Sequence, residues 1–370
     1  MRAVVCLFFF ASNLLIQAES VNVYFGTRGH SAEGIYRAEL DKLSGKLSSI
    51  QLAAEARIPA FLALHPTKKI LYAITGDREN ATVTSFTIQE DGGLMQLNQV
   101  KGADGRSAHI AVHPSGLFLM TAQYGGGSVA LYPLKEDGSL EPCKQKVEHQ
   151  GASGVVKNRQ QGPHPHWVGF SPDARFAFVP DLGLDQIIIY RINTSELTIE
   201  QVGAAQSVPG GGPRHMRFSV NGKFIYLLNE LELSVTTFAY DEETGSTERL
   251  TTTKALSEEQ KANESFNSAS EILVHPNGLF VYTGNRGHDS VTVYQADPKT
   301  GKLEVVEVEP IRGSWPRNIN MDTSGRWLLA AGANSNTLSV FEVDPETGEL
   351  TFPRGAVYNI PEVICILFDE

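Results

Sequence analysis

Histidine, arginine and glutamate stand in this sequence at the ends of short apolar segments that recur about every 50 residues. His166, Arg214 and Glu271 lie at or next to the beginning of such segments, and Glu230 and Arg286 follow the ends of others. A histidine or carboxylate can take a proton from water, and a guanidinium group can donate hydrogen bonds to a carbonyl oxygen on which charge develops. These residue types indicate acyl chemistry, such as the hydrolysis of a lactone.

The number of arginines indicates an anionic lactone or carboxylate as substrate, because the guanidinium fork binds a carboxylate or phosphate through two parallel hydrogen bonds. We expect His166 or Glu230 to be the base and Arg214 or Arg286 to supply the donors. Glu230 should stay ionised beside two arginines, which suits a base or an orienting group better than an acid. The substrate-binding residues predicted around this catalytic set are His109, His215, Glu271 and Arg317.

Metal binding is a competing use of these side chains. His164 and His166 are separated by one proline, which makes them a poor chelating pair, and we expect His164 in a loop. Calcium would need several carboxylates, and the available ones are Asp181, Glu230 and Glu271. We therefore predict no metal and no other cofactor. An ion pair between Arg214 and Glu230 that only joins two strands is the structural alternative.

The apolar segments belong to a sequence repeat that occurs six times. Each copy has an apolar strand, a turn such as His-Pro-Asn-Gly, a second apolar strand, a polar loop and a third strand, and its turn residues are 48, 58, 48, 56 and 47 residues apart. This period and the alternation of apolar residues predict four-stranded antiparallel propeller blades. The copies begin at Phe61, His109, His166, His215, Glu271 and Asn318.

Two incomplete copies remain at the ends of the chain. Val21–Gly26 matches a second strand without a first, and Pro361–Phe368 matches a first strand without a second. Paired, they complete a seventh blade and close the ring, which leaves no open sheet edge. We therefore predict an all-β fold in which residues 21–370 form one seven-bladed propeller.

The blade geometry brings the candidate residues together. In an antiparallel pair, the beginning of the first strand and the end of the second lie at the same edge, so residues at these positions converge on one mouth of the central channel. The second strands also end at Arg28, Arg78 and Tyr124. At the opposite edge, turn geometry explains the residues of the turns, which include His65, His113 and His275.

Composition and charge limit the partners. The chain has 370 residues, 41% of them hydrophobic, and a formal net charge of -11. This composition is typical of a globular protein, and the acidic charge without a long basic stripe argues against nucleic acid and anionic membranes as partners. We expect a monomer whose ligand is a small molecule.

The N-terminus predicts secretion. Arg2 is followed by the 14-residue apolar run Ala3–Ile16 and by Ala18, so residues 1–20 resemble a signal peptide, and the run is too short to span a bilayer. After its removal we expect no integral membrane segment and a location in the secretory pathway or outside the cell; if the segment is not a functional signal, the protein is cytosolic. Three glycosylation sequons fit this route, at Asn80, Asn193 and Asn263.

The mature chain would retain two cysteines, which cannot make a disulfide framework. Cys365 stands in the apolar stretch Val363–Leu367, so we expect it to be buried and structural.

Taken together, these motifs resemble the seven-bladed lactonase family, which includes propeller-type 6-phosphogluconolactonases and fungal carboxy-cis,cis-muconate cyclases. The resemblance covers Val21–Phe368, and its first two motifs are the most specific. The motifs are Gly-Gly-Pro-Arg-His-Met-x-Phe at 211–218, Leu-Asn-Glu-Leu at 228–231, Ser-x-Glu-Ile-x-x-His-Pro-Asn-Gly at 268–278, Asn-Arg-Gly at 285–287 and Pro-Arg-Asn-Ile at 316–319.

The resemblance implies that His166, Arg214, Glu230 and Arg286 form the active site and that it works without a metal. The family's pentose phosphate enzymes are cytosolic, so the predicted signal peptide favours an extracellular lactone or a muconate-type acid as substrate. Two alternatives to lactone hydrolysis remain open, a cyclase that forms a lactone from a muconate and a secreted binding propeller without catalysis.

Overall fold

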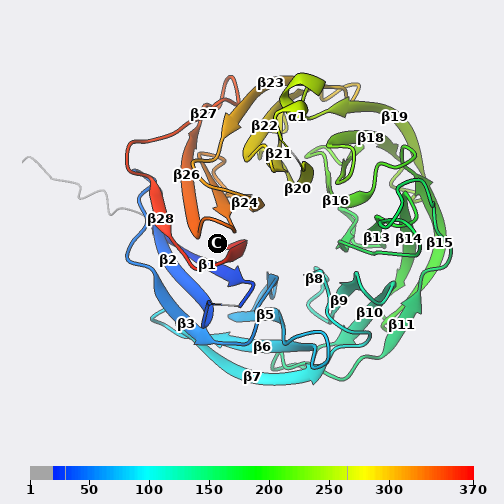
Figure 1. Ribbon diagram of the computed structural model, residues 1–370. Coiled ribbons are helices and arrows are strands. Elements are labelled where there is room, and N and C mark those ends of the chain that lie inside the picture. Colours follow the sequence, from blue (N-terminus) through cyan, green and yellow to red (C-terminus); the bar gives the residue numbers. More distant parts are fainter. Residues whose placement is uncertain (1–19, 30, 265) are drawn as a thin grey trace, which may run out of the picture.

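The computed structural model describes residues 20–29, 31–264 and 266–370. Its strands form seven sheets that are arranged as blades around a central axis (Figure 1), which confirms the predicted propeller. Within the described residues there is one helix, α1 (Glu258–Ala262). The predicted signal peptide falls on residues 1–20, of which only Ser20 is described.

Each blade is an antiparallel sheet whose strands follow one another outward from the axis. The strands of blade 1 are β29 (Val363–Asp369), β1 (Ser20–Thr27), β2 (Gly34–Asp41) and β3 (Gln51–Glu55). Those of blade 2 are β4 (Leu62–Leu64), β5 (Ile70–Thr75), β6 (Thr82–Ile88) and β7 (Leu94–Lys101). Those of blade 3 are β8 (His109–Val112), β9 (Phe118–Gln123), β10 (Ser128–Pro133) and β11 (Gln145–Glu148).

The other blades repeat this order. The strands of blade 4 are β12 (Gly169–Phe170), β13 (Phe176–Asp181), β14 (Gln186–Asn193) and β15 (Thr198–Gln206). Those of blade 5 are β16 (Pro213–Phe218), β17 (Phe224–Asn229), β18 (Ser234–Tyr240) and β19 (Thr247–Lys254). Those of blade 6 are β20 (Ser268–Val274), β21 (Phe280–Arg286), β22 (Ser290–Ala296) and β23 (Leu303–Pro310). Blade 7 has β24 (Pro316–Met321), β25 (Trp327–Gly332) and β26 (Thr337–Val343), and its outer edge is split between β27 (Leu350–Thr351) and β28 (Val357–Asn359).

The hydrophobic core lies between the blades. The second strands β5, β9, β13, β17, β21 and β25 are buried at every residue, because the neighbouring blades cover both of their faces. Seven clusters of buried apolar residues each join two adjacent blades, one cluster for every interface of the ring. Burial of this apolar surface holds the ring together blade by blade.

The ring closes as predicted. β1 pairs with β29 in an antiparallel register that places Asn22 opposite Asp369 and Tyr24 opposite Leu367. The pairing shifts after Gly26, where a Cβ atom would lie 2.6 Å from the carbonyl oxygen of Pro59. Only a glycine lets the first two blades approach this closely.

In five of the seven blades, a turn packs on the blade before it. A glycine between the third and fourth strands packs on the residue that begins the second strand of the preceding blade, as Gly301 does on Phe224. The same contact joins Gly45 to Trp327, Gly138 to Ile70, Gly245 to Phe176 and Gly348 to Phe280.

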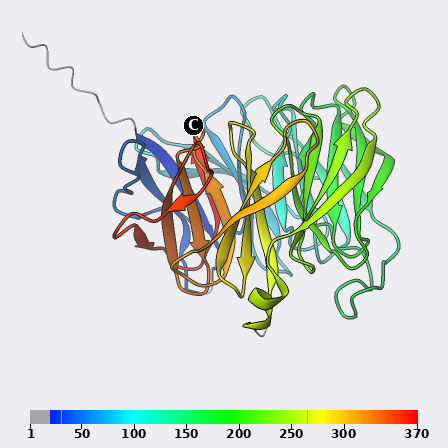
Figure 2. The ribbon, with the colours of Figure 1, turned by 90° about the horizontal axis from the view of Figure 1, so that it is seen from above.

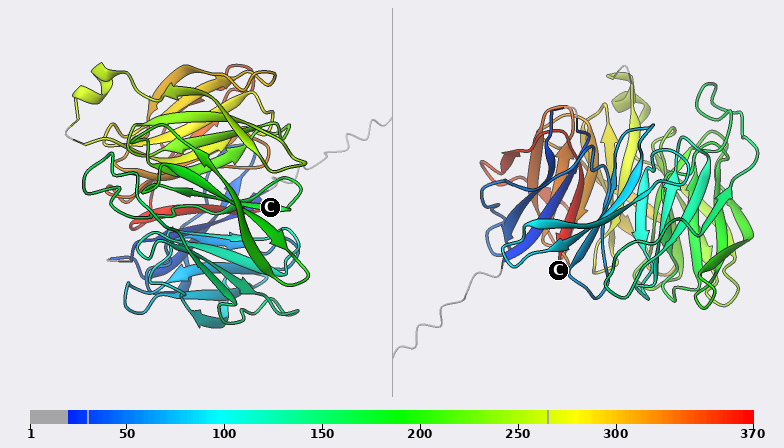
Figure 3. Two further views of the ribbon diagram at one scale, coloured as in Figure 1. Left: turned by 90° about the vertical axis from the view of Figure 1, so that its right-hand side faces the viewer. Right: turned by 90° about the horizontal axis from the view of Figure 1, so that it is seen from below.

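The two flat faces of the ring differ. α1 and the loop before blade 4 project from one face, and the C-terminus lies at the other (Figure 2, Figure 3). The turns with His65, His113 and His275 contact the next blade through their imidazoles, whose Nε2 atoms lie 3.3, 2.9 and 3.1 Å from the carbonyl oxygens of Gly116, Ala174 and Gly325. These histidines therefore join blades, in agreement with their interpretation as structural residues.

Candidate functional site

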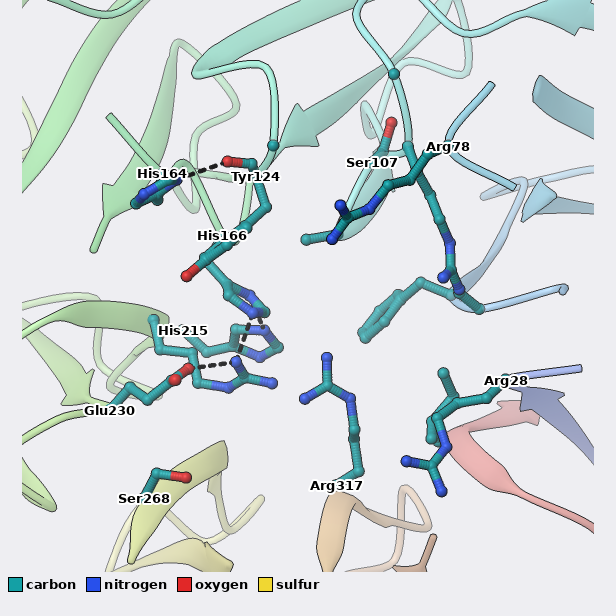
Figure 4. Close-up of a pocket in the computed structure, with 18 of the residues that line it drawn as sticks. Arg28, Arg78, Ser107, Tyr124, His164, His166, His215, Glu230, Ser268 and Arg317 are labelled. Carbon is teal, nitrogen blue, oxygen red and sulfur yellow. Dashed lines mark hydrogen bonds and ion pairs between the residues drawn. The ribbon is translucent and has the colours of Figure 1, made fainter. Parts of the chain in front are cut away.

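A cavity of about 860 Å³ opens at one mouth of the central channel, where first strands begin and second strands end. His166 of blade 4, His215 and Glu230 of blade 5, and Arg317 of blade 7 converge in it (Figure 4). Seven arginines and two carboxylates line it, a surplus of five positive charges in a chain whose net charge is -11. The arginines are Arg28, Arg78, Arg106, Arg159, Arg214, Arg286 and Arg317.

Glu230 holds three of these arginines. Its Oε2 atom lies 2.6 Å from Nη1 of Arg214 and 3.3 Å from Nη2 of Arg286, and its Oε1 atom accepts a hydrogen bond of 2.7 Å from Arg159. Burial raises the pKa of Glu230, but the surrounding guanidinium charges, above all that of Arg286, lower it more and keep its net value well below the usual range. Both carboxylate oxygens are thus occupied by donors, so the predicted Arg214–Glu230 pair exists within a larger cluster.

Irregular strand beginnings aim the key side chains into the cavity. In β16 the register shifts between Pro213 and His215, so that Arg214 is an extra residue opposite β17. The same irregularity occurs around Glu271 in β20 and at Arg317 in β24. A bulge redirects side chains that strict alternation would turn away, which explains how neighbouring residues such as Arg214 and His215 both reach the site.

A chain of hydrogen bonds runs from the cavity into the protein. Nη1 of Arg214 donates to Nε2 of His166, and Nδ1 of His166 lies 3.2 Å from Nε2 of His215. Nδ1 of His215 lies 2.9 Å from Oε1 of Glu271. Burial lowers the pKa of both histidines; the charge of Arg214 lowers that of His166 further, whereas Glu271 opposes the effect on His215, whose pKa is about 4. Both imidazoles are therefore neutral near pH 7.

Two of the predicted substrate-binding residues lie behind the cavity wall. His109 packs against Phe61 and Trp167, with ring centroids 4.3 and 5.4 Å away. Glu271 accepts hydrogen bonds from Arg217 and from Nδ2 of Asn318, at 3.1 and 2.7 Å. Neither residue lines the cavity, so the structure connects Glu271 to it only through His215.

Several cavity residues were not among the predicted site residues. Arg28 and Arg78 follow second strands, so their position could have indicated them. Arg159 and Arg106 stand in loops, where the blade pattern gives no signal. His164 is in a loop, as expected, and it also lines the cavity, stacked on Tyr124 with centroids 4.6 Å apart.

Trp315 and Phe266 add an apolar side to the cavity. Their rings are stacked with centroids 5.8 Å apart, and the guanidinium carbon of Arg286 lies 5.4 Å from the centroid of the Trp315 ring. Trp315 has a φ of 65°, which is unusual for a bulky residue, and its backbone N–H donates to Asp289 at 2.7 Å. Such local strain often marks a functional position.

Other expectations concern residues outside the cavity. Asn80, Asn193 and Asn263 are exposed, which a glycosylation site requires. Cys365 is buried, as expected, and burial raises the pKa of its thiol to about 12. In the described part of the chain, no three metal-binding side chains cluster, and no helix is long and apolar enough to cross a membrane.

Comparisons of the sequence and of the structure with known proteins agree with one another. The family described as "Lactonase, 7-bladed beta-propeller" matches residues 22–368. A 6-phosphogluconolactonase of Bacillus subtilis is 33% identical over 92% of this chain and 96% of its own length, and one of Formosa agariphila is 31% identical over 88% and 93%. The structure of a periplasmic gluconolactonase of Pseudomonas aeruginosa superimposes with a TM-score of 0.86 at 29% identity, covering 95% of this chain and 99% of that one.

Proposed function

The chain belongs to the lactonase family of seven-bladed β-propellers, and on this basis we propose that it hydrolyses a lactone that carries an anionic group. A phosphorylated sugar lactone is the leading candidate, because relatives that match most of the chain are named 6-phosphogluconolactonases, whereas the predicted signal peptide, which favours an extracellular lactone or a muconate-type acid, falls almost wholly outside the described residues. One observation supports the anionic group above all. The cavity contains seven arginines, and Glu230 neutralises only one of their charges. Such a surplus is costly in a partly closed cavity unless an anion binds there.

The unpaired arginines provide the binding site for that anion. Among the described residues, Arg78, Arg106 and Arg317 form no ion pair or hydrogen bond, and burial together with Arg214 lowers the pKa of Arg317 well below its usual range. Arg28 also lines the cavity (Figure 4), and its Nη2 atom donates to the carbonyl oxygen of Ala333 and to Oδ1 of Asn334, both at 3.0 Å. A phosphate or carboxylate would accept several charge-assisted hydrogen bonds there and would restore the preference of Arg317 for its charged form.

The Glu230 cluster would act on the carbonyl group. Arg214 and Arg286 can donate to the oxygen as it becomes negative, and Glu230 holds them in place. Glu230 itself is a poor base, because both of its oxygens accept hydrogen bonds from guanidinium groups. We therefore assign the base to His166, whose neutral imidazole can take a proton from the attacking water once Arg214 releases its Nε2 atom.

A panel of lactones tests this proposal. We expect kcat/KM to be at least about 10-fold higher for 6-phosphogluconolactone than for gluconolactone, because binding of the charged group adds at least one charge-assisted hydrogen bond. Arg106→Ala should raise KM for the phosphorylated lactone and change the rate with the neutral one little. Arg326→Ala is the control, since this exposed arginine pairs with Glu342 away from the cavity.

Other results with this panel would contradict different parts of the proposal. Equal kcat/KM values for the two lactones would contradict the anion site. Lactones that open no faster than in buffer would contradict hydrolysis, and loss of muconate absorbance in the same preparation would then identify a cyclase.

A further inference from the structure

His166 is the first of three buried groups that are linked end to end. Nδ1 of His166 meets Nε2 of His215, and Nδ1 of His215 meets Oε1 of Glu271. All three residues are at most 5% exposed. The distances of 3.2 and 2.9 Å are those of hydrogen bonds, so protons can move along this line without leaving the protein.

The direction of the hydrogen bonds follows from the ends of the line. Glu271 is ionised and can only accept, so Nδ1 of His215 carries a proton and its Nε2 atom is an acceptor. Nδ1 of His166 must then carry a proton as well, and its Nε2 atom has the lone pair that Arg214 contacts. The lone pair on Nε2 of His166 thus points to the cavity, and the proton on Nδ1 of His166 points away from the cavity.

A proton that stayed on His166 would be unfavourable. His166 faces the guanidinium group of Arg214, and Arg286 and Arg317 also lower its pKa. His215 faces His109, Arg214 and Arg217, but it is also in contact with a carboxylate, which favours its protonated form. The charged groups around the two imidazoles are Arg214, Arg217, Arg286, Arg317, Glu230 and Glu271.

We propose that His166, His215 and Glu271 form a proton relay in which His215 stores the proton that the attacking water loses; this inference rests on the proposed lactone hydrolysis. As the water oxygen bonds to the carbonyl carbon, its proton passes to Nε2 of His166, and the carbonyl π electrons move to the oxygen. The Nδ1 proton of His166 passes to Nε2 of His215, which becomes an imidazolium paired with the Glu271 carboxylate. When the ring C–O bond breaks, the proton returns through His166 to the leaving oxygen.

Glu271 is built to remain charged during this cycle. Its oxygens also accept hydrogen bonds from Arg217, Asn318 and the backbone N–H of Ile272. Burial raises its pKa, but His215 and Arg217 lower it more, to about 2, so the proton rests on the imidazole. Glu271 therefore positions His215 and stabilises its charge, while His166 alone touches the water.

Glu271→Gln tests the relay. The amide can donate to Nδ1 of His215, which would move the proton of His215 to Nε2 and prevent it from accepting the one from His166. We expect kcat to fall by about 10²–10⁴-fold, the typical contribution of general acid–base catalysis, with KM changed less than about threefold. Because Glu271 raises the pKa of His215, its loss should also move the acid limb of the pH–rate profile to lower pH.

The matched control is His149→Gln. His149 is another buried imidazole held by a carboxylate, with its Nδ1 atom 2.7 Å from Oδ2 of Asp181, and it does not line the main cavity. The His149→Gln substitution should lower the free energy of unfolding and leave the pH–rate profile unchanged. An acid limb that stays in place in Glu271→Gln would show a merely structural role and overturn the relay, while lactone hydrolysis by the wild type would still stand.

A measurement without substrate separates the two proposals further. Nitrogen NMR of labelled imidazoles should show His166 and His215 neutral at pH 7 with protons on Nδ1, and Glu271→Gln should change the tautomer of His215. If Glu271→Gln does not fold, His215→Gln is the second variant. It should abolish the shift of the Nδ1 proton signal of His166 that the hydrogen bond to His215 causes. A proton found on Nε2 of either wild-type imidazole would overturn the relay even if every lactone is hydrolysed.

Discussion

At the scale of single residues, Glu230 is the centre of the candidate site because three arginines depend on it. Two of its partners, Arg214 and Arg286, are almost completely buried, so the loss of its charge would leave guanidinium groups together without compensation. Mutual repulsion would then displace the donors that we assign to the carbonyl oxygen.

We therefore predict that Glu230→Gln lowers kcat/KM by about 100-fold or more, as for loss of an aligned oxyanion donor, and lowers the free energy of unfolding by about 3 kcal/mol, the scale for breaking a buried ion pair. Kinetics and urea unfolding would measure the two effects. Glu232→Gln removes the same charge two residues away, outside the cavity, and should change neither. A Glu230→Gln enzyme with wild-type kinetics would show that the cluster only holds strands together.

The catalytic residues predicted from the sequence follow the blade pattern; Arg28 and Arg78 follow it too but were not predicted, and the cavity residues in loops were missed. His166, Arg214, Glu230 and Arg286 all line one cavity, because their positions at strand ends determine where they lie. Arg159 could not be predicted, because it lies in a loop and no strand determines the direction of its side chain. Strict alternation also could not show that Glu271 lies behind His215, because bulges set the direction of side chains at these strand beginnings.

At the scale of elements, the contacts between turn and strand hold adjacent blades together. At Gly301 a φ of 70° already favours glycine, and a Cβ atom would lie 2.6 Å from Cδ1 of Phe224. The fold could be predicted because the repeat was visible in the sequence, whereas this contact required the actual packing of one blade on the next.

We predict that Gly301→Ala lowers the free energy of unfolding by about 2–4 kcal/mol, which combines backbone strain with overpacking. Thermal and urea unfolding would measure this. Gly355→Ala is the control for strain alone, since its φ is 83° and no atom lies within 4 Å of the added Cβ position. Equal losses in both variants would mean that the blade contact contributes nothing, and kcat and KM should stay unchanged in both.

At the scale of the whole molecule, buried neutral histidines make the fold sensitive to acid. Burial lowers the pKa of six histidines in the described part of the chain, so the folded protein resists protonation that the unfolded chain accepts below pH 6.5. Their stabilising contribution is complete above pH 6.5 and is lost as the pH falls towards the folded-state values.

We predict that the free energy of unfolding falls between pH 6.5 and 5, by about 2 kcal/mol for His215, whose folded-state pKa is about 4. His109 and His166 should add to the loss in the same direction, because burial lowers their pKa values too. Urea unfolding at a series of pH values would measure the slope of the free energy of unfolding against pH. His109→Phe keeps an aromatic ring but removes one titrating group, and it should make the slope shallower. An unchanged slope would contradict the assignment of a neutral His109.

The pairing of β1 with β29 also determines how the ring responds to force. The two strands are antiparallel, and the register places Asn22 near the start of one opposite Asp369 near the end of the other. A pull on the two ends of the described chain therefore loads one hydrogen-bonded pair at a time, as in opening a zipper, and does not shear the whole strand. We expect the propeller to open at low force between these two strands, although thermal unfolding must separate seven extensive blade interfaces.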